Sequence, residues 1–398
     1  MKAGTERHLT RISQRAQAIK PSGIRKFFDI LASLEGVISL GVGEPDYATP
    51  WRPREAAIKS LEQGKTMYTS NLGTPELRQA IADYLGASYG LNYNPATEIL
   101  ITVGVSEAMD LAMRAVLNPG DEVIMPAPCY VAYPALVSLS GGVPVIVPTT
   151  AERDFEVEPS DIENHITENT RAIFIGYPAN PTGAVMPRRK LMGIAETAKR
   201  HNLLVISDEI YARLSYGDPH TCFASLPGMR EQTVLLGGFS KAYAMTGWRV
   251  GYAAGPHEII AAMTKIHQYT IMCAPTMSQV AALEAIKTSE ESVLEMVADY
   301  NRRRLLMVNG LREIGLTCFE PKGAFYAFPC IRATGMTSEE FAEKLLQEEK
   351  VAVVPGTAFG ECGEGYVRCC YATAVPELQE ALLRMRRFVE KHQVQPKG

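Results

Sequence analysis

A lysine in an unusual setting is the first residue of this sequence that points to chemistry. Lys241 lies in the stretch GGFSKAYAMTGWRVGY (237–252), between Ser240 and a run of small and apolar residues. No acidic residue lies within four positions of it on either side. A solvated lysine usually has polar neighbours and acidic partners at helical spacing, so Lys241 is predicted to be buried or reactive.

Polar groups also follow three apolar runs that are typical of β-strands. Gly104, Val105 and Ser106 follow a strand and open a helix, where free N–H groups and the helix dipole suit a phosphate. The alternative is that Ser106 only caps its own helix. Ser240 and Arg249 would add a hydroxyl and a guanidinium as further phosphate donors. The three strand ends with such polar groups are TVGVSEA (102–108), YPANPTG (177–183) and SDEIY (207–211).

Asp208 ends the apolar strand LLVIS (203–207). A carboxylate that faces a ligand crevice at such a strand end is costly unless it meets a cation or a donor. A protonated pyridine nitrogen would satisfy it, and the alternative is an aspartate that caps a helix. Tyr211 and Asn180 are predicted to face the same crevice as donors to a phenolate oxygen.

Together these groups match the needs of pyridoxal phosphate. They comprise a lysine that can form a Schiff base, an acid for a ring nitrogen, donors for a ring oxygen and a cradle for a phosphate. In a desolvated site next to cations, Lys241 would have the lowered pKa that a Schiff-base nucleophile needs. The pyridinium ring of this cofactor serves as an electron sink for a carbanion.

The elements that must position these residues follow a regular alternation. From about residue 97, short β-branched runs alternate with longer segments of helical period. Continuous apolar strands between helices predict an α/β fold with a mostly parallel sheet that helices cover on both faces. In such sheets ligands collect at the carboxyl ends of the strands, so the polar groups are predicted to meet there.

The length of the chain predicts two domains. With 398 residues, 46% of them hydrophobic, it is too long for one ordinary domain. The stretch 280–312 is helical in pattern and lacks proline, so it is interpreted as the long element that leaves the first domain. A second, smaller α/β unit follows Gly323. We expect an N-terminal arm with part of the small domain (1–45), a large cofactor-binding domain (46–285) and a small C-terminal domain (286–398).

Composition argues against several classes of partner. The net charge of −4 gives no basic surface for nucleic acid. The N-terminal residues 1–23 contain no apolar run of the length of a secretory signal, and no stretch of the sequence has the length of a membrane span, so we expect a cytoplasmic protein with no membrane partner. The eight cysteines show no CxxC spacing and the histidines no HxxxH or HExxH spacing, so neither disulfides nor a metal are expected.

In combination, the motifs resemble those of the class I/II aminotransferases, which are fold-type I pyridoxal phosphate enzymes. Their order and spacing agree over nearly the whole chain and are most similar to the aspartate and aromatic aminotransferase subgroup. The resemblance implies a large domain with a mostly parallel, helix-covered sheet and a smaller α/β domain. The motifs are SLGVGEPD (39–46), VGVSEA (103–108), PCYVAY (128–133), NPTG (180–183), SDEIY (207–211), SKAYAMTGWRVGY (240–252) and YVRCCYA (366–372).

The resemblance also implies roles at the cofactor. Lys241 would attach it as a Schiff base and later shuttle the proton between Cα and C4′. Asp208 would pair with the pyridine nitrogen, while Tyr211 and Asn180 would hydrogen-bond the ring oxygen. Tyr130 matches an aromatic residue that stacks on the ring face; the alternative is a core or interface aromatic. The residues implied to hold the phosphate are Gly104, Val105, Ser106, Ser240 and Arg249.

Two further features carry implied contacts from outside the cofactor site. Tyr68, in MYTSNLG (67–73), matches a tyrosine that reaches the phosphate of the neighbouring subunit, which implies a homodimer with shared active sites. The segment SGIRKFF (22–28) resembles a stretch that closes over the substrate, where Ile24 would contact the side chain. The alternative for this segment is an ordinary connector.

The implied activity is the transfer of an amino group between small molecules. Arg368 would form a two-pronged salt bridge to the substrate α-carboxylate, assisted by Asn180 and the backbone of Gly43. We expect an aromatic or acidic L-amino acid as donor and 2-oxoglutarate as acceptor, in a ping-pong cycle. No second arginine can be assigned from the sequence to a side-chain carboxylate.

Other functions remain as alternatives at this point. An aminotransferase for N-acetyl-diaminopimelate or alanine, or a pyridoxal phosphate β-lyase, would use the same fold. A regulatory protein with a DNA-binding module is disfavoured, because the roughly 20 residues before Pro21 are too few for one. A nicotinamide dehydrogenase is disfavoured because GVGEPD (41–46) lacks the third glycine of the dinucleotide motif and no helix pattern follows.

Overall fold

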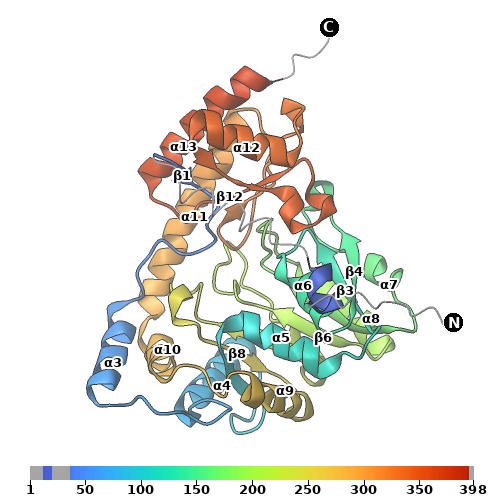
Figure 1. Ribbon diagram of the computed structural model, residues 1–398, viewed down its shortest axis with the longest axis vertical. Helices are drawn as coiled ribbons and strands as arrows, with labels where there is room; N and C mark the ends of the chain where they lie inside the picture. Colours follow the sequence, from blue (N-terminus) through green and yellow to red (C-terminus); the bar gives the residue numbers. More distant parts are fainter. Residues whose placement is uncertain (1–11, 20–35, 394–398) are drawn as a thin grey trace, which may run out of the picture.

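The computed structural model describes residues 12–19 and 36–393. The stretch 22–28 with Ile24, predicted to cover the substrate, lies outside these residues. Figure 1 shows a large lower unit, built around a seven-stranded sheet, and a smaller upper unit. Within the described ranges, no helix has the length and apolar character needed to cross a membrane.

The sheet of the large unit has the strand order β2-β8-β7-β6-β5-β3-β4. All strands except β8 run in the same direction, so the predicted mostly parallel sheet is confirmed. β8 is antiparallel because it follows β7 through residues 239–250 without a crossover helix. The strands are β2 (Ile99–Thr102), β3 (Glu122–Ala127), β4 (Val143–Pro148), β5 (Thr170–Gly176), β6 (Leu204–Asp208), β7 (Thr233–Gly238) and β8 (Gly251–Ala254).

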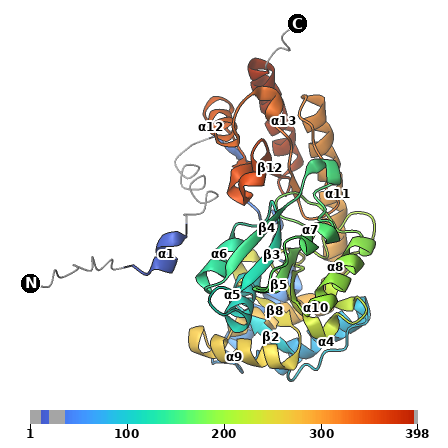
Figure 2. The same cartoon turned by 90° about the vertical axis from the view of Figure 1, so that its right-hand side faces the viewer.

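Helices cover both faces of this sheet, as predicted (Figure 2). α5, α6 and α9 lie on one face, while α4, α8 and α10 lie on the other. Strand β2 shows why: Leu100 packs into one layer, and its neighbours Ile99 and Ile101 pack into the other. The helices are α1 (Gln14–Ala18), α3 (Trp51–Glu62), α4 (Pro75–Tyr89), α5 (Gly104–Val116), α6 (Ala132–Leu139), α7 (Pro159–Glu163), α8 (Arg188–Arg200), α9 (His257–Thr270) and α10 (Thr276–Thr288).

The small unit combines short strands with three helices. β1 pairs in parallel with β10, and β11, β12 and β9 form an antiparallel sheet. Thr337 begins α12 with a capping box to Glu340, and the buried rings of Phe341 and Phe388 join α12 to α13. The elements are β1 (Ile38–Ser39), α11 (Glu290–Glu313), β9 (Tyr326–Ala327), α12 (Ser338–Glu349), β10 (Val351–Ala352), β11 (Val354–Pro355), β12 (Val367–Cys370) and α13 (Val375–His392).

The stretch 280–312, predicted as one long element, belongs to two helices. α10 ends at Thr288 and α11 begins at Glu290, with Ser289 in a non-helical conformation between them (φ −106°, ψ 16°). Glu290 and Glu291 occupy the first turn of α11, where negative charge is favourable at the positive end of the helix dipole. α11 alone therefore runs from the large unit to the small one (Figure 1). We propose that the domain boundary lies between α10 and α11.

Candidate active site

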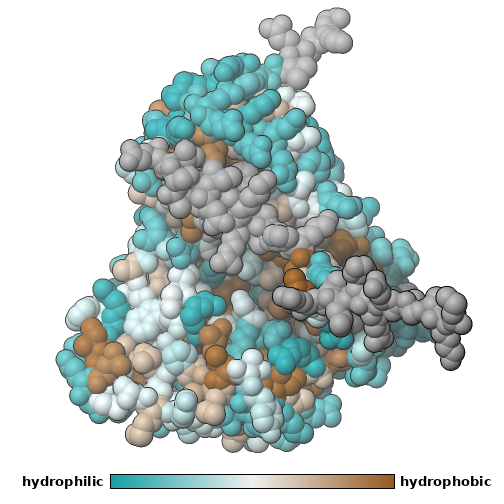
Figure 3. Space-filling model, in the orientation of Figure 1, coloured by the Kyte–Doolittle hydropathy of each residue, from teal (hydrophilic) through white to brown (hydrophobic). Residues whose placement is uncertain are grey.

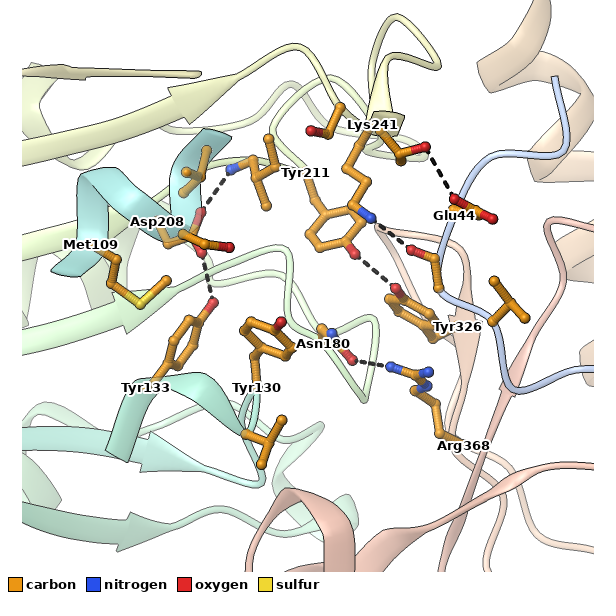
Figure 4. Close-up of a pocket in the computed structure, with 18 of the residues that line it drawn as sticks. Glu44, Met109, Tyr130, Tyr133, Asn180, Asp208, Tyr211, Lys241, Tyr326 and Arg368 are labelled. Atoms are coloured by element: carbon orange, nitrogen blue, oxygen red, sulfur yellow. Dashed lines mark hydrogen bonds between the residues drawn. The ribbon is translucent and has the colours of Figure 1, made fainter. Parts of the chain in front are cut away.

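A cavity of about 640 Å³ opens at the carboxyl ends of the parallel strands. Its wall is completed by the loop of residues 42–44 and by Arg368 from the small unit (Figure 4). The cavity brings together residues that lie far apart in the sequence. The predicted site residues that line it are Gly43, Val105, Ser106, Tyr130, Asn180, Asp208, Tyr211, Ser240, Lys241, Arg249 and Arg368.

Lys241 points into this cavity from the turn after β7. Its Nζ donates a hydrogen bond of 2.6 Å to the carbonyl oxygen of Gly43. The rings of Tyr211 and Phe325 each lie with their centroids 5.7 Å from the same nitrogen. Burial lowers the pKa of Lys241 to about 8, and the nearby guanidinium of Arg368 acts in the same direction. The lowered pKa agrees with the expectation from the sequence.

Asp208 is the last residue of β6 and is buried. The Tyr133 hydroxyl donates to its Oδ2 over 2.9 Å, and the backbone N–H of Ile210 donates to its Oδ1 over 3.1 Å. Burial raises the pKa of Asp208 to about 6, although both hydrogen bonds act to lower it. Within the described chain, no lysine or arginine lies within salt-bridge distance of this carboxylate. The Asp208 carboxylate is therefore suited to pair with a cationic group of a ligand.

Tyr133 was not identified as a site residue by the sequence reasoning. It lies in PCYVAY, three positions after Tyr130, which is the spacing that places two side chains on one side of a helical turn. The two rings meet edge-on, with centroids 5.6 Å apart, and both line the cavity. This spacing was the available signal for finding Tyr133.

Tyr211 meets a second residue that the sequence reasoning missed. Its hydroxyl lies 2.7 Å from the hydroxyl of Tyr326, which belongs to β9 of the small unit. Burial raises the pKa of Tyr211 well above its usual value, so the hydroxyl keeps its proton and can donate. Tyr326 is in AFYAFP (324–329), a stretch whose apolar character indicated only a strand.

Arg368 lies on β12 and is only 2% exposed. One terminal nitrogen donates to Asn180 Oδ1 over 2.8 Å, and the other donates to the carbonyl oxygen of Gly41 over 2.6 Å. The guanidinium also stacks on the rings of Tyr326 and Phe359. Its Nε is buried without a partner, and none of the ion pairs among the described residues includes Arg368. This buried cation therefore lacks a counter-charge.

The opposite end of the cavity has the features of an anion site. α5 begins at Gly104, and its cap residue is Val103 and not Ser106, so no side chain at the cap position closes this helix end. Arg249 has a left-handed conformation (φ 53°) after the short 3₁₀ turn Thr246–Trp248. Its guanidinium nitrogen lies 2.6 Å from the point that a Cβ on Gly104 would occupy. A side chain at Gly104 would therefore displace the guanidinium.

The residues present fit pyridoxal phosphate. The free N–H groups of α5, the hydroxyl of Ser240 and the guanidinium of Arg249 form a cradle for a phosphate. Asp208 offers a buried carboxylate with no cation, as a protonated ring nitrogen requires. Lys241 lines the same cavity and has the lowered pKa of a reactive amine. The donor set thus matches each polar part of the cofactor.

Two residues that the sequence singled out, Gly104 and Tyr68, do not line the cavity. Gly104 lies behind it, against Arg249. Tyr68 is 80% exposed on the loop before α4 and is not part of the cavity of this chain. Ile24 is not among the described residues.

Comparison with known proteins agrees with this geometry. The family model for aminotransferase class I and II matches residues 35–385. A putative aminotransferase, YugH, of Bacillus subtilis is 58% identical over 96% of this chain and 98% of its own length. An aspartate aminotransferase of Pyrococcus abyssi is 46% identical over 96% of this chain and 98% of its own length. Such identity over whole chains shows the family.

A solved structure gives the same result. The crystal structure of an aromatic aminotransferase from Pyrococcus horikoshii matches with a TM-score of 0.88 and 46% identity. The match covers 92% of this chain and 99% of that structure. The chain therefore belongs to the class I and II aminotransferases, and it is a pyridoxal-phosphate-dependent enzyme that acts on amino acids and 2-oxo acids.

Proposed function

We propose that the protein transfers the amino group of an aromatic or acidic L-amino acid to 2-oxoglutarate. The observation that carries the proposal is the pairing, in one cavity, of an amine of lowered pKa at Lys241 with a buried arginine that lacks a counter-charge, Arg368. Similar proteins include an aspartate aminotransferase of Pyrococcus abyssi and aromatic-amino-acid aminotransferase 2 of Thermococcus litoralis. Both names support this choice of donors.

Asp208 and the cradle at α5 would hold the two ends of the cofactor. The Asp208 carboxylate, ionised at neutral pH, would keep a ring nitrogen protonated, because an opposite charge in a buried site favours the cationic form. Tyr211 and Asn180 would donate to the ring oxygen, and Tyr130 would cover the ring face. Gly104, Val105, Ser106, Ser240 and Arg249 would hold the phosphate. When bound, pyridoxal phosphate supplies the electron sink for the electron pair left on the substrate Cα.

Lys241 holds and moves the proton. A pKa near 8 leaves part of its amine unprotonated at neutral pH, so Nζ can take a proton from the substrate Cα. The rings of Tyr211 and Phe325 beside Nζ keep water away from it. Transamination differs from racemisation in that this proton does not return to Cα, and Nζ is the group of this chain that would carry it.

Arg368 binds the substrate α-carboxylate. Its two terminal nitrogens now donate to the oxygens of Asn180 and Gly41, and a carboxylate takes the place of one or both acceptors. The cavity contains one such arginine, and amino donor and oxo acceptor both carry an α-carboxylate. The two substrates therefore use the same site in turn, which supports a ping-pong cycle.

The side walls of the cavity favour an aromatic donor over an acidic one. Val42, Met109, Tyr130 and Tyr326 give the cavity an apolar lining. Besides Lys241 and Arg368, the only cation among the described lining residues is Arg249, at the phosphate end. An acidic donor needs a further cation for its side-chain carboxylate, and none of the other described lining residues supplies one.

A homodimer is part of this proposal. Tyr68 and Met67 are 80% and 79% exposed, and the Met67 carbonyl accepts a hydrogen bond from Thr276. The apolar side chains around them suit a subunit interface, across which Tyr68 reaches the phosphate of the partner. Hydrophobic patches are visible low on the face in Figure 3. The exposed apolar residues of α3, of the last turn of α9 and of the turn after it are Trp51, Ile58, Leu61, Tyr269, Ile271 and Met272.

A reducing, cytoplasmic setting also belongs to the proposal. All eight cysteines are free thiols. Most of them are buried, and burial raises the pKa of the Cys369 and Cys129 thiols, which keeps them protonated and unreactive. Proteins of oxidising compartments commonly pair their cysteines instead.

A single-turnover experiment without acceptor tests the proposal. The cofactor-loaded protein is mixed with excess L-phenylalanine or L-aspartate, and the 2-oxo acid and ammonia are measured. One equivalent of 2-oxo acid per subunit and no ammonia are expected, with the amino group released as L-glutamate after 2-oxoglutarate is added. Continuous release of ammonia and pyruvate from β-substituted amino acids, with no need for an acceptor, would favour a β-lyase instead.

A further inference from the structure

Arg303 forms a buried ionic hub outside the cavity. It lies on α11 and is 8% exposed. One terminal nitrogen lies 2.7 Å from Asp46 Oδ2, and the other lies 2.7 Å from Asp299 Oδ2. The rings of Tyr47 and Tyr300 each have their centroid 5.5 Å from the guanidinium carbon. The side chain is thus fixed by two carboxylates and two aromatic rings.

The hub joins three segments of the chain. Asp46 belongs to the loop that follows β1, and Asp299 belongs to α11 itself. Arg303 also donates to the carbonyl oxygen of Thr373 over 2.9 Å, and Thr373 follows the end of β12. Tyr300 reinforces the junction, because its hydroxyl donates to Asp46 Oδ1 over 3.3 Å. A single guanidinium therefore ties the loop, the helix and the end of β12 together.

Two of these three segments carry polar groups of the cavity. The loop between β1 and α3, which contains Asp46, presents the carbonyl oxygens of Gly41 and Gly43, which accept hydrogen bonds of 2.6 Å from Arg368 and Lys241 respectively. β12 carries Arg368 itself, a few residues before Thr373. The hub thus fixes both the substrate-binding arginine and one of its present acceptors.

We infer that Arg303 is a positioning residue for substrate binding: it sets the place of Arg368 relative to the loop of residues 41–46. The inference rests on the proposed role of Arg368. A planar guanidinium holds two carboxylates and a carbonyl in a fixed geometry that no other side chain reproduces. Small shifts of a binding group reduce productive substrate binding steeply, so loss of the hub weakens recognition of the α-carboxylate.

The test compares Arg303→Met with Arg302→Met in the full-length, cofactor-loaded protein. Arg302 is the matched control, because it is the adjacent residue of α11 and pairs with the same Asp299 at 2.8 Å, but its side chain is 72% exposed. The measured quantities are kcat and KM for the amino donor with 2-oxoglutarate as acceptor. Binding of 3-phenylpropanoate and succinate, carboxylates that have no amino group to transfer, is measured by calorimetry.

Arg303→Met is expected to raise KM and to weaken binding of the better of the two carboxylates by about tenfold, with kcat within about threefold. Arg302→Met is expected to leave both quantities unchanged. Unchanged KM and unchanged carboxylate binding in a folded Arg303→Met protein would overturn the inference. So would equal effects of the two substitutions.

Asp46→Asn provides an independent second variant, because it keeps Arg303 and removes only the charge of the loop. If Arg303→Met does not fold, Asp46→Asn decides, and it is expected to raise KM by about threefold or more. An unchanged KM in Asp46→Asn would contradict the inference. Arg368→Lys separates the two proposals. If Arg368→Lys leaves carboxylate binding intact, the proposed role of Arg368 is wrong. If Arg368→Lys weakens carboxylate binding but Arg303→Met does not, only the positioning role of Arg303 is refuted.

Discussion

Helix α8 and the active-site cavity each contain a lysine that is shielded from solvent, Lys190 and Lys241. The two lysines differ in their partners. Lys190 bonds Glu156 over 2.8 Å and Glu158 over 2.5 Å. Burial alone would lower the pKa of Lys190, but the hydrogen bonds of the two glutamates raise it. Lys241 has no such carboxylate, and its pKa falls to about 8. The lysine outside the cavity is paired with carboxylates of the chain itself, whereas the lysine inside the cavity has no carboxylate partner from the chain and is free to interact with ligands.

Two buried arginines show the same contrast. Arg303 is held between Asp46 and Asp299, while Arg368 has only the neutral oxygens of Asn180 and Gly41. An unpaired buried cation is costly, so such a position is stable only if other contacts compensate for it. In Arg368 the stacking on Tyr326 contributes to this compensation. We therefore interpret unpaired buried charges in this molecule as binding positions.

The largest effect is expected from replacing the unpaired lysine. Lys241→Ala should lower kcat for transamination by roughly three orders of magnitude or more, because the proton carrier is lost. The matched control, Lys190→Ala, should leave kcat within about threefold but destabilise the fold by roughly 3 kcal/mol, since two glutamates lose their partner. Steady-state rates and thermal unfolding check both variants. Normal turnover in Lys241→Ala would refute the assignment.

The amine of Lys241 should become reactive at a lower pH than the amine of Lys190. Competitive labelling of the cofactor-free protein with acetic anhydride, followed by peptide mass spectrometry, gives the midpoint for each amine. Lys241 should become reactive with a midpoint near pH 8, because burial lowers its pKa. Lys190 should become reactive only at a higher pH than Lys241, because Glu156 and Glu158 raise its pKa. Equal midpoints would contradict the contrast drawn between the two sites.

Arg368→Lys should lower kcat/KM for the amino donor on the order of a hundredfold, mainly through KM. A lysine keeps the charge but cannot give the planar, two-pronged contact to a carboxylate. Steady-state kinetics over a range of donor concentrations check this expectation. A fall in kcat at unchanged KM would instead assign Arg368 to the chemical step.

The smallest effect concerns the stability of the cofactor-free protein. The pKa of Asp208 is raised to about 6 in the fold, so its ionised form is disfavoured there. The wild type should therefore lose stability as the pH rises from about 4 through about 6, because the unfolded chain ionises first. Asp208→Asn avoids this loss and should be more stable than the wild type by about 2 kcal/mol at pH 8, and equal to it at pH 4. Urea unfolding at the two pH values measures the difference; a less stable variant at pH 8 would contradict it.

The sequence predicted those parts of the site that depend on local pattern. The alternation of strands and helices indicated the parallel sheet, and the polar residues at strand ends included Ser106, Asn180, Asp208 and Lys241, which all line the cavity. These predictions succeeded because the carboxyl ends of parallel strands meet at one edge, whatever the details of packing.

Contacts between distant segments were not predictable in the same way. The hydroxyl contact of Tyr326 with Tyr211 and the bond from Arg368 to Gly41 depend on how the small unit packs against the large one. The reversed strand β8 and the break at Ser289 were also missed as details, because apolar runs carry no direction and the helical period continues through the serine. Periodicity identifies elements, whereas tertiary packing selects their partners.

The central claim is that the unpaired charges of the cavity are completed by a cofactor and a substrate carboxylate. The most direct measurement is the visible spectrum of the purified protein, loaded with pyridoxal phosphate, during addition of aromatic, acidic, branched, alanine and diaminopimelate-type amino acids in turn. We expect an absorption band that an aromatic or acidic donor removes and 2-oxoglutarate restores, and no such response in Lys241→Ala. No absorption band after addition of pyridoxal phosphate, or the same response in Lys241→Ala, would contradict it.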